Sequence, residues 1–300
     1  MATNFIAIAL GISGFPIAAL SATEVTDDAG TRIHLERPAQ RVMTLAPNLT
    51  ELAFAAGGGA KVVGVTRFSD YPEAAKRLPV VSDAFILNLE AIAQAKPDLI
   101  FTWISGTPQR QRDALKKLGI PVYESEIQDV TGIASTMQRM GQLMGTSAVA
   151  SQASQDFLGQ WKTLEKTRAT QLTAAGGQRL RVFYQVWDKP LMTFNGKHLV
   201  SHAIDMCGGV QGFDKLSALT PTVSREAVLA FDPQLILSGN PQGLPMWQAF
   251  PTLSATAKKQ LKPANAVLLT RMGPRFVQAA EELCEQIDAA RQAYSGNQRP

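Results

Sequence analysis

Short runs of apolar residues alternate with amphipathic stretches along most of this chain. Continuous apolar runs are typical of strands buried on both faces of a sheet, and an apolar residue at every third or fourth position is typical of a helix that covers the sheet. Strands that alternate with helices in this way predict an α/β fold with mainly parallel sheets. The expected strands are residues 31–35, 41–45, 61–65, 99–102, 120–123, 181–186, 234–237 and 266–269.

One long stretch breaks the alternation, because residues 130–173 keep a helical pattern without any expected strand. Residues 146–174 fit a single helix, in which apolar side chains from Phe157 to Leu172 approximate one stripe. Gly176 follows and is suited to ending that helix. The sequence therefore predicts two Rossmann-like lobes joined by a single long backbone helix.

The first 22 residues, MATNFIAIALGISGFPIAALSA, carry no charge and end in small residues suited to signal-peptide cleavage. Gly11, Gly14 and Pro16 argue against a membrane-spanning helix, and the missing basic residue means that either the assigned start is imperfect or the export signal is atypical. We expect an exported, periplasmic protein. The expected divisions are residues 1–22 as signal peptide, 23–145 as N-terminal lobe, 146–176 as interlobe helix and 177–300 as C-terminal lobe.

Export changes the interpretation of the two cysteines, Cys207 and Cys284. They are far apart in the sequence and belong to no CxxC or metal-ligand pattern. In a reducing compartment they would be two buried thiols, whereas in an oxidising one they form a natural pair. With export expected, we favour the disulfide.

One phrase occurs twice: residues 88–101 read NLEAIAQAKPDLIF and residues 224–237 read SREAVLAFDPQLIL. The Glu-Ala pair, the Pro and the Leu-Ile pair coincide at one constant offset. A helix, a Pro turn and a strand make a common α/β phrase, so chance is one explanation, but the shared positions favour two related lobes. Folding requires no acid at Glu90 or Glu226, which makes both glutamates candidates for recognition of a partner.

Charge and motif content favour binding over catalysis. The net charge is only +4 and no basic run occurs, so the charge is too small and too scattered to indicate nucleic-acid binding. Dinucleotide, P-loop, nucleophile-elbow and zinc-protease motifs are absent from the sequence. His198 and His202 are spaced to face one metal, but no carboxylate or cysteine motif accompanies them. An enzyme with a metal or other cofactor would need a richer set of ligands, so we expect a non-enzymatic protein without a cofactor.

Two lobes with a cleft between them form a natural site for a small ligand. Aromatic and basic residues in loops or at the ends of the expected strands are candidates for its walls. Core packing or loop anchoring is the alternative for each of them. The candidates are Tyr71, Phe85, Trp103, Trp187, Trp247, Arg271 and Arg275.

Six stretches of the sequence carry a resemblance to a known family: RVMTLAPNLTELAFAAG, GVTRFSDYPEAAKRLPVVS, NLEAIAQAKPDLIFTW, DMCGGVQGF, VSREAVLAFDP and AAEELC. In this order they are distributed over residues 41–290. The chain resembles the class III substrate-binding proteins of ABC importers, which have a rigid helical backbone and carry cobalamin, siderophores or haem. The resemblance implies a monomer that delivers its ligand to an ABC permease dimer with its ATPase.

The same resemblance implies roles for individual residues. Glu90 and Glu226 would be the two surface glutamates, one per lobe, that meet arginines of the permease. Tyr71 and Trp103 would contact a corrinoid ligand. Cys207 and Cys284 match the disulfide of the family.

Other positions depart from the pattern of the family. Two family tryptophans fall at Ala84 and Thr220, and a phenylalanine position is occupied by Val186, beside Trp187. The loop before the last helix is shortened to TRMGPR, which leaves Arg271 and Arg275 without the acidic residue of the family. The expected ligand is cobalamin or a related corrinoid, and haem or a ferric siderophore is the alternative.

Overall fold

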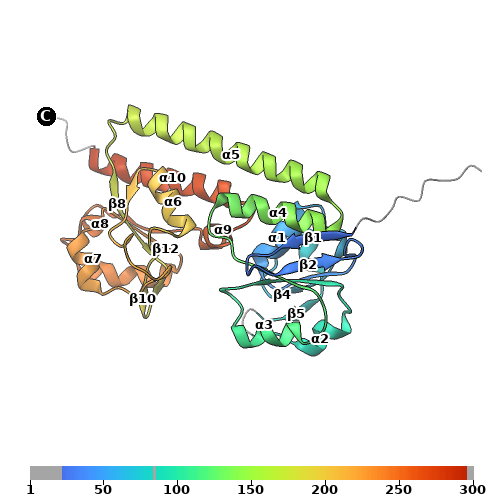
Figure 1. Ribbon diagram of the computed structural model, residues 1–300. Coiled ribbons are helices and arrows are strands. Elements are labelled where there is room, and N and C mark those ends of the chain that lie inside the picture. The colour runs from blue at the N-terminus through green and yellow to red at the C-terminus, as the bar shows by residue number, and fades with distance from the viewer. Residues whose placement is uncertain (1–21, 84–85, 296–300) are drawn as a thin grey trace, which may run out of the picture.

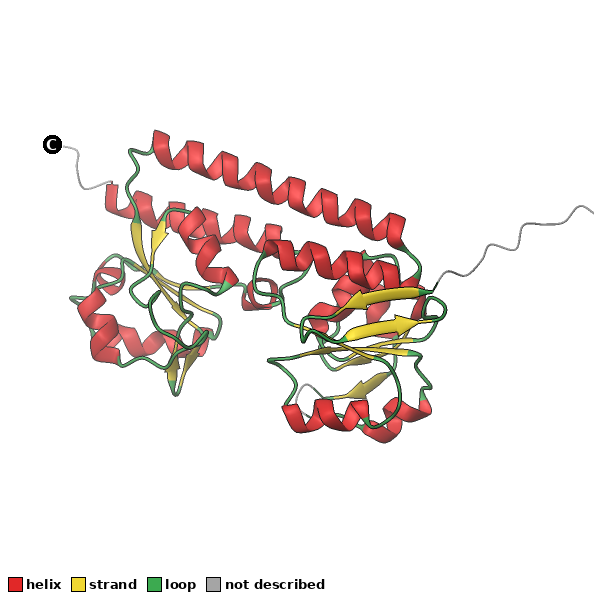
Figure 2. Cartoon of the chain, viewed as in Figure 1, coloured by secondary structure: helices red, strands yellow, loops and turns green. Residues whose placement is uncertain are grey.

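A computed structural model describes residues 22–83 and 86–295, and it has the expected mixed α/β architecture (Figure 1). Two lobes lie side by side beneath one long helix, α5 (Ser147–Ala174), which corresponds to the helix expected at residues 146–174. Helices cover the faces of the sheets in both lobes, as Figure 2 shows. None of the helices in the described residues is both long and apolar enough to span a membrane.

The N-terminal lobe is built on a five-stranded, fully parallel sheet with the order β5-β4-β3-β6-β7. The expected strand at residues 31–35 lies outside this sheet, because it pairs only with the strand before it in an antiparallel hairpin. The strands are β1 (Thr23–Thr26), β2 (Arg32–Leu35), β3 (Val42–Thr44), β4 (Val62–Thr66), β5 (Val80–Ser82), β6 (Leu99–Trp103) and β7 (Val122–Ser125). The helices are α1 (Pro47–Ala55), η1 (Gly59–Lys61), η2 (Glu73–Arg77), α2 (Leu89–Gln94), α3 (Gln109–Lys116) and α4 (Val130–Met144).

The C-terminal lobe contains a four-stranded parallel sheet with the order β11-β8-β12-β13 and a small hairpin of β9 and β10. The strands are β8 (Leu180–Gln185), β9 (Trp187–Asp188), β10 (Leu191–Met192), β11 (Gly209–Val210), β12 (Leu235–Ser238) and β13 (Leu261–Pro263). The helices are α6 (Leu199–Met206), α7 (Arg225–Phe231), η3 (Pro241–Ala249), α8 (Ser254–Ala257), α9 (Ala266–Thr270) and α10 (Phe276–Ser295).

The strand expected at residues 266–269 is wrong, since these residues form helix α9. The edge strand of the sheet comes earlier, at Leu261–Pro263, where it pairs with β12. The side chain of Asn265 accepts a hydrogen bond from the backbone N–H of Leu268 and so caps α9. One helical turn then buries Leu268 and Leu269 in the core, which an apolar run of this length permits as readily as a strand.

Helix α5 ties the two lobes together through a shared core. Its buried face presents Phe157, Trp161 and Leu164, and the Trp161 ring lies 5.8 Å from that of Phe276 on α10. One continuous cluster of buried side chains includes this face and the inner sides of both sheets. The cysteine prediction is confirmed, because Cys207 at the end of α6 is bonded to Cys284 of α10. The disulfide fastens α6 to α10 within the C-terminal lobe, whereas the packing of α5 and the shared core restrict how far one lobe can move against the other.

Candidate functional site

Two neighbouring cavities lie between the lobes. The first, about 210 Å³, is lined by Trp103 and Asn48 of the N-terminal lobe and by Arg271 of the C-terminal lobe, and we call it the Trp103 cavity. The second, about 290 Å³, is lined by residues of both lobes that include His198, and we call it the His198 cavity. Both cavities include Ile127 and Met272 in their walls, so they adjoin between the lobes, and we call the space that they form together the interlobe cleft.

Trp103 is positioned by the end of strand β6, as the sequence predicts. The strand lies between β3 and β7 in the parallel sheet, and its last residue emerges at the edge that faces the other lobe. The half-buried ring rests directly on Gly106, where a Cβ atom would come within 1.8 Å of the ring carbon Cε3. A side chain at position 106 would therefore displace the ring, so this glycine is required to hold Trp103 in the cavity wall.

A buried carboxylate joins the lobes beside the Trp103 cavity. Glu51 lies on α1 of the N-terminal lobe, and its side chain is only 1% exposed. Arg275 donates from Nε and Nη2 to its two oxygens at 3.0 and 2.5 Å, and Arg271 donates from Nη1 at 3.2 Å. The hydrogen bonds to Glu51 raise the pKa of Arg275 above its usual value. We call this group, Glu51 with Arg271 and Arg275, the interlobe clamp.

The clamp also holds the loop that follows β4. Arg271 binds Asp70 at 2.5 Å and the carbonyl oxygen of Phe68 at 2.8 Å, and this pairing lowers the pKa of Asp70. The guanidinium of Arg275 lies over the ring of Tyr71 at 3.9 Å. Both arginines expected at a ligand site are thus held by the N-terminal lobe, and of the two only Arg271 lines one of the interlobe cavities.

Phe68 is a candidate wall residue that the sequence reasoning missed. Its backbone is left-handed, with φ of 69°, and its side chain is 61% exposed, next to the 44% exposed Tyr71. A bulky residue adopts this conformation only where its surroundings impose it, as the hydrogen bond from Arg271 to its carbonyl oxygen does here. The signal was present in the sequence, because Phe68 belongs to the same RFSDYP loop that supplied Tyr71.

The other aromatic candidates lie in different environments. Trp187 is 51% exposed on β9, and its Nε1–H donates to the carbonyl oxygen of Lys189 at 3.1 Å. Val186 is half-buried against the core, and neither residue lines the two interlobe cavities. Trp247 is fully buried and donates to Gln185 Oε1 at 2.6 Å, which supports its alternative interpretation as a core residue. Phe85 lies outside the described residues.

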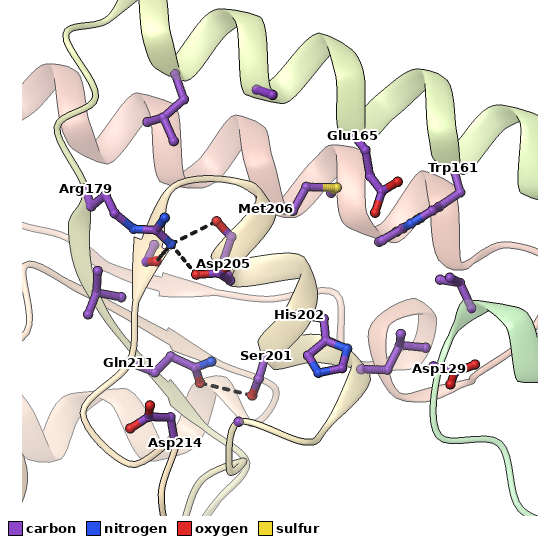
Figure 3. Close-up of a pocket in the computed structure, with 17 residues that line it drawn as sticks. Asp129, Trp161, Glu165, Arg179, Ser201, His202, Asp205, Met206, Gln211 and Asp214 are labelled. Carbon is purple, nitrogen blue, oxygen red and sulfur yellow. Dashed lines mark hydrogen bonds and ion pairs between the residues drawn. The ribbon is translucent and has the colours of Figure 1, made fainter.

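His198 is the N-cap of α6 and His202 lies on that helix, and the two face different spaces rather than one metal. His198 is buried in the wall of the interlobe cavity, where burial lowers its pKa to about 4, with a smaller contribution from His202. His202 is exposed in a groove of about 780 Å³ beside α5, together with Asp129, Glu165 and an Arg179–Asp205 ion pair (Figure 3). Within residues 22–83 and 86–295, no cluster of His, Cys, Asp and Glu side chains is arranged to hold a metal ion.

Glu90 and Glu226 occupy equivalent places on the two lobes. Each is exposed in the first turn of a helix, α2 or α7, and these helices lie away from α5 (Figure 1). The expected caps are present, since Asn88 accepts from the Ala91 N–H at 3.0 Å and Ser224 accepts from the Ala227 N–H at 3.1 Å. Hydrogen bonds from its own backbone N–H and from Ser224 lower the pKa of Glu226, so this carboxylate stays ionised.

The chain is similar in sequence to one family of known proteins. Residues 42–295 match the model of a family described as periplasmic binding protein. The chain is 35% identical over 256 residues to the vitamin B12-binding protein of Vibrio cholerae serotype O1, which is 84% of this chain and 91% of the relative. It is 37% identical over 253 residues to the vitamin B12-binding protein of Yersinia pestis, which is 83% of this chain and 86% of the relative.

Solved structures show the same likeness. The crystal structure of the periplasmic vitamin B12 binding protein of Vibrio cholerae matches with a TM-score of 0.75 and 35% identity, over 85% of this chain and 98% of that chain. A periplasmic heme-binding protein from Roseiflexus matches with a TM-score of 0.74 over 84% of this chain and 99% of that chain. At 21% identity, this second likeness concerns the fold alone.

Proposed function

The chain belongs to the periplasmic binding protein family, and from this premise we propose that it captures cobalamin or a related corrinoid between its lobes. The observation that carries the proposal is the 35% identity to a vitamin B12-binding protein over 84% of the chain. The two cavities of the interlobe cleft supply a fitting site. We infer further that the protein is exported, through the signal expected in residues 1–22, and delivers its ligand to an ABC permease dimer with its ATPase.

A flat macrocycle would lie across the mouth of the cleft, and the two cavities would receive groups from its periphery. Neither cavity, at about 210 and 290 Å³, is large enough to enclose such a ring with its side chains. Trp103 forms one wall, and the exposed rings of Phe68, Tyr71 and Trp187 would supply further apolar surface. Burying one such ring contributes about 1.5–3 kcal/mol, so several rings would provide useful affinity.

The proposed cleft is largely formed before the ligand arrives. Helix α5, the shared core and the interlobe clamp all connect the lobes through contacts within the chain itself. A site that needs little reordering loses little of its interaction energy to conformational entropy. We therefore expect small changes in lobe orientation on binding.

Delivery would use the paired surface glutamates. Glu90 and Glu226 are exposed and symmetric with respect to the two lobes, which suits a permease built from two equivalent subunits with basic pockets. Charges at the rim of such an interface mainly set the association rate and the register, and salt screens them.

The absorption spectrum of the protein purified from periplasm tests the ligand class. A corrinoid spectrum in the purified protein, absent after removal of the ligand and restored by cyanocobalamin, is the expected result. A haem spectrum would instead support the alternative, a haem-binding protein of the same class. A bound metal cluster with neither chromophore would contradict a role in corrinoid transport and favour an enzyme.

A further inference from the structure

The His198 cavity carries polar groups from both lobes. The C-terminal lobe contributes His198 and Lys197, and the N-terminal lobe contributes Ser105 and Glu126. Lys197 and Glu126 carry opposite charges. The cavity therefore combines hydrogen-bond donors and acceptors, and its formal charges cancel.

His198 is fixed as a hydrogen-bond donor toward this cavity. Its ring is 5% exposed and stacks on Phe194 with centroids 3.7 Å apart, while Nδ1 accepts the backbone N–H of Val200 at 3.1 Å. A neutral imidazole with an accepting Nδ1 carries its proton on Nε2. Within the part of the chain that the structure describes, no side chain or carbonyl oxygen accepts a hydrogen bond from this Nε2–H.

The same tautomer argues against a metal-binding role for His198. Coordination through Nε2 would require the proton to move to Nδ1, where it would meet the N–H of Val200. The helix α6 would then lose the cap that this histidine provides. His198 is thus suited to a ligand that presents an acceptor atom and not to axial ligation of a metal.

Glu126 offers the complementary acceptor on the other wall. Its Oε2 accepts the backbone N–H of Ser105 at 2.8 Å, and its Oε1 has no hydrogen-bond partner among the described residues. Asn195, which also lines the cavity, is occupied on both sides, since it donates to the carbonyl oxygen of Leu216 and accepts from the N–H of Lys197. The donor of His198 and the acceptor of Glu126 are therefore available to a ligand from opposite lobes, together with the side chains of Lys197, Gln128 and Ser217 that also line the cavity.

We propose that the His198 cavity is a subsite for a primary amide on the periphery of the ligand, with His198 donating to the amide oxygen and Glu126 accepting from the amide N–H. A carboxylate at the same place offers acceptors only, so it would leave Glu126 facing a like charge without a hydrogen bond. Lys197 is exposed, so its attraction for that carboxylate is screened by solvent. The inference rests on the proposed function, because it assigns part of the same cleft to the amide side chains of a corrinoid.

Calorimetric titration with cyanocobalamin and with its monocarboxylic acids, in which one amide has been hydrolysed, tests the subsite. For the wild-type protein we expect at least one monoacid to bind at least about tenfold more weakly than cyanocobalamin, because sites that hydrogen-bond a polar group reject analogues that cannot pair with it. Glu126→Gln should reduce that preference to about threefold or less, because the new amide can donate to a carboxylate. Glu165→Gln, an exposed carboxylate in the separate groove of Figure 3, is the matched control and should keep the preference.

A second pair of variants tests the donor. His198→Asn keeps a good capping residue for α6 but removes the Nε2–H, and it should weaken cyanocobalamin binding about tenfold. His202→Asn, on the same helix but exposed outside the cleft, should bind as the wild type does. Tight cyanocobalamin binding with equal affinity for every monoacid, or a preference unchanged by Glu126→Gln, would overturn the subsite alone. Wild-type protein that binds no cyanocobalamin would overturn the proposed function and the subsite together.

Discussion

The substitution Glu51→Gln tests whether the interlobe clamp stabilises the arrangement of the lobes. It removes the buried carboxylate on which Arg271 and Arg275 converge while keeping nearly the same shape. Both arginine side chains are themselves mostly buried, at 13% and 21% exposure. The change would therefore leave two cations in a poorly solvated place with fewer partners.

The stability loss in Glu51→Gln depends on which hydrogen-bond partners each side chain keeps. Removing one member of a buried ion pair costs about 3–5 kcal/mol, much of it from the charge left without a partner. Arg271 keeps Asp70 and the carbonyl oxygen of Phe68, and a glutamine at position 51 keeps one acceptor oxygen. We therefore expect the lower end, a loss of about 3 kcal/mol, which for a chain of this size lowers the Tm by about 6 °C.

Urea denaturation and thermal unfolding of wild type, Glu51→Gln and Glu165→Gln measure this loss. Glu165 is an exposed glutamate on α5, so its substitution should change stability by less than about 0.5 kcal/mol. The double variant Glu51→Gln/Arg275→Gln should lose much less stability than the sum of the losses in the two single variants, because the residues form one network. A Glu51→Gln protein with the Tm of the wild type, or fully additive effects, would refute the reasoning.

Three other predictions follow from the structure. Replacing both Glu90 and Glu226 with Ala should leave the affinity for cyanocobalamin unchanged and weaken association with the permease in a salt-dependent way; loss of ligand binding would place them in the pocket instead. Replacing Cys207 and Cys284 with Ala should lower the free energy of unfolding by about 4 kcal/mol, because the disulfide closes a loop with a sequence separation of 77 residues. A wild-type protein that is equally stable under reducing and oxidising conditions would count against this contribution of the disulfide. The pKa of His198 is lowered to about 4 in the folded protein, so the unfolded chain binds more protons between pH 6.5 and 4, and the free energy of unfolding should fall by about 3 kcal/mol as the pH drops through that range. His198→Asn should remove this part of the pH dependence, and a variant with the pH profile of the wild type would contradict the prediction.

The elements that local sequence determines were predictable. Asn88 and Ser224 cap their helices as expected, and the repeated phrase forms α2 with β6 in one lobe and α7 with β12 in the other. Residues 266–269 were not predictable in the same way, because a short apolar run suits a buried strand and a buried helical turn equally well. The choice between them depends on Leu261–Pro263 already occupying the edge of the sheet.

The contacts that assemble the site join residues far apart in the sequence. Arg271 and Arg275 reach Glu51 across 220 and 224 residues, and no local pattern connects a glutamate in a largely buried, apolar helix with these two arginines. Aromatic content alone did not distinguish Trp103, in the cavity wall, from Trp247, in the core. Exposure decides that question, and exposure depends on how the whole chain packs.

Calorimetric titration of the purified, ligand-free protein with cyanocobalamin tests the central claim most directly. We predict one site per chain with a Kd below about 10 μM, which corresponds to about −7 kcal/mol, and a clearly weaker response to haem and ferric siderophores. Replacing Trp103 with Ala should weaken this binding without lowering the Tm by more than a few degrees. Saturable binding of haem or a ferric siderophore, with no binding of any corrinoid at this concentration, would contradict the account.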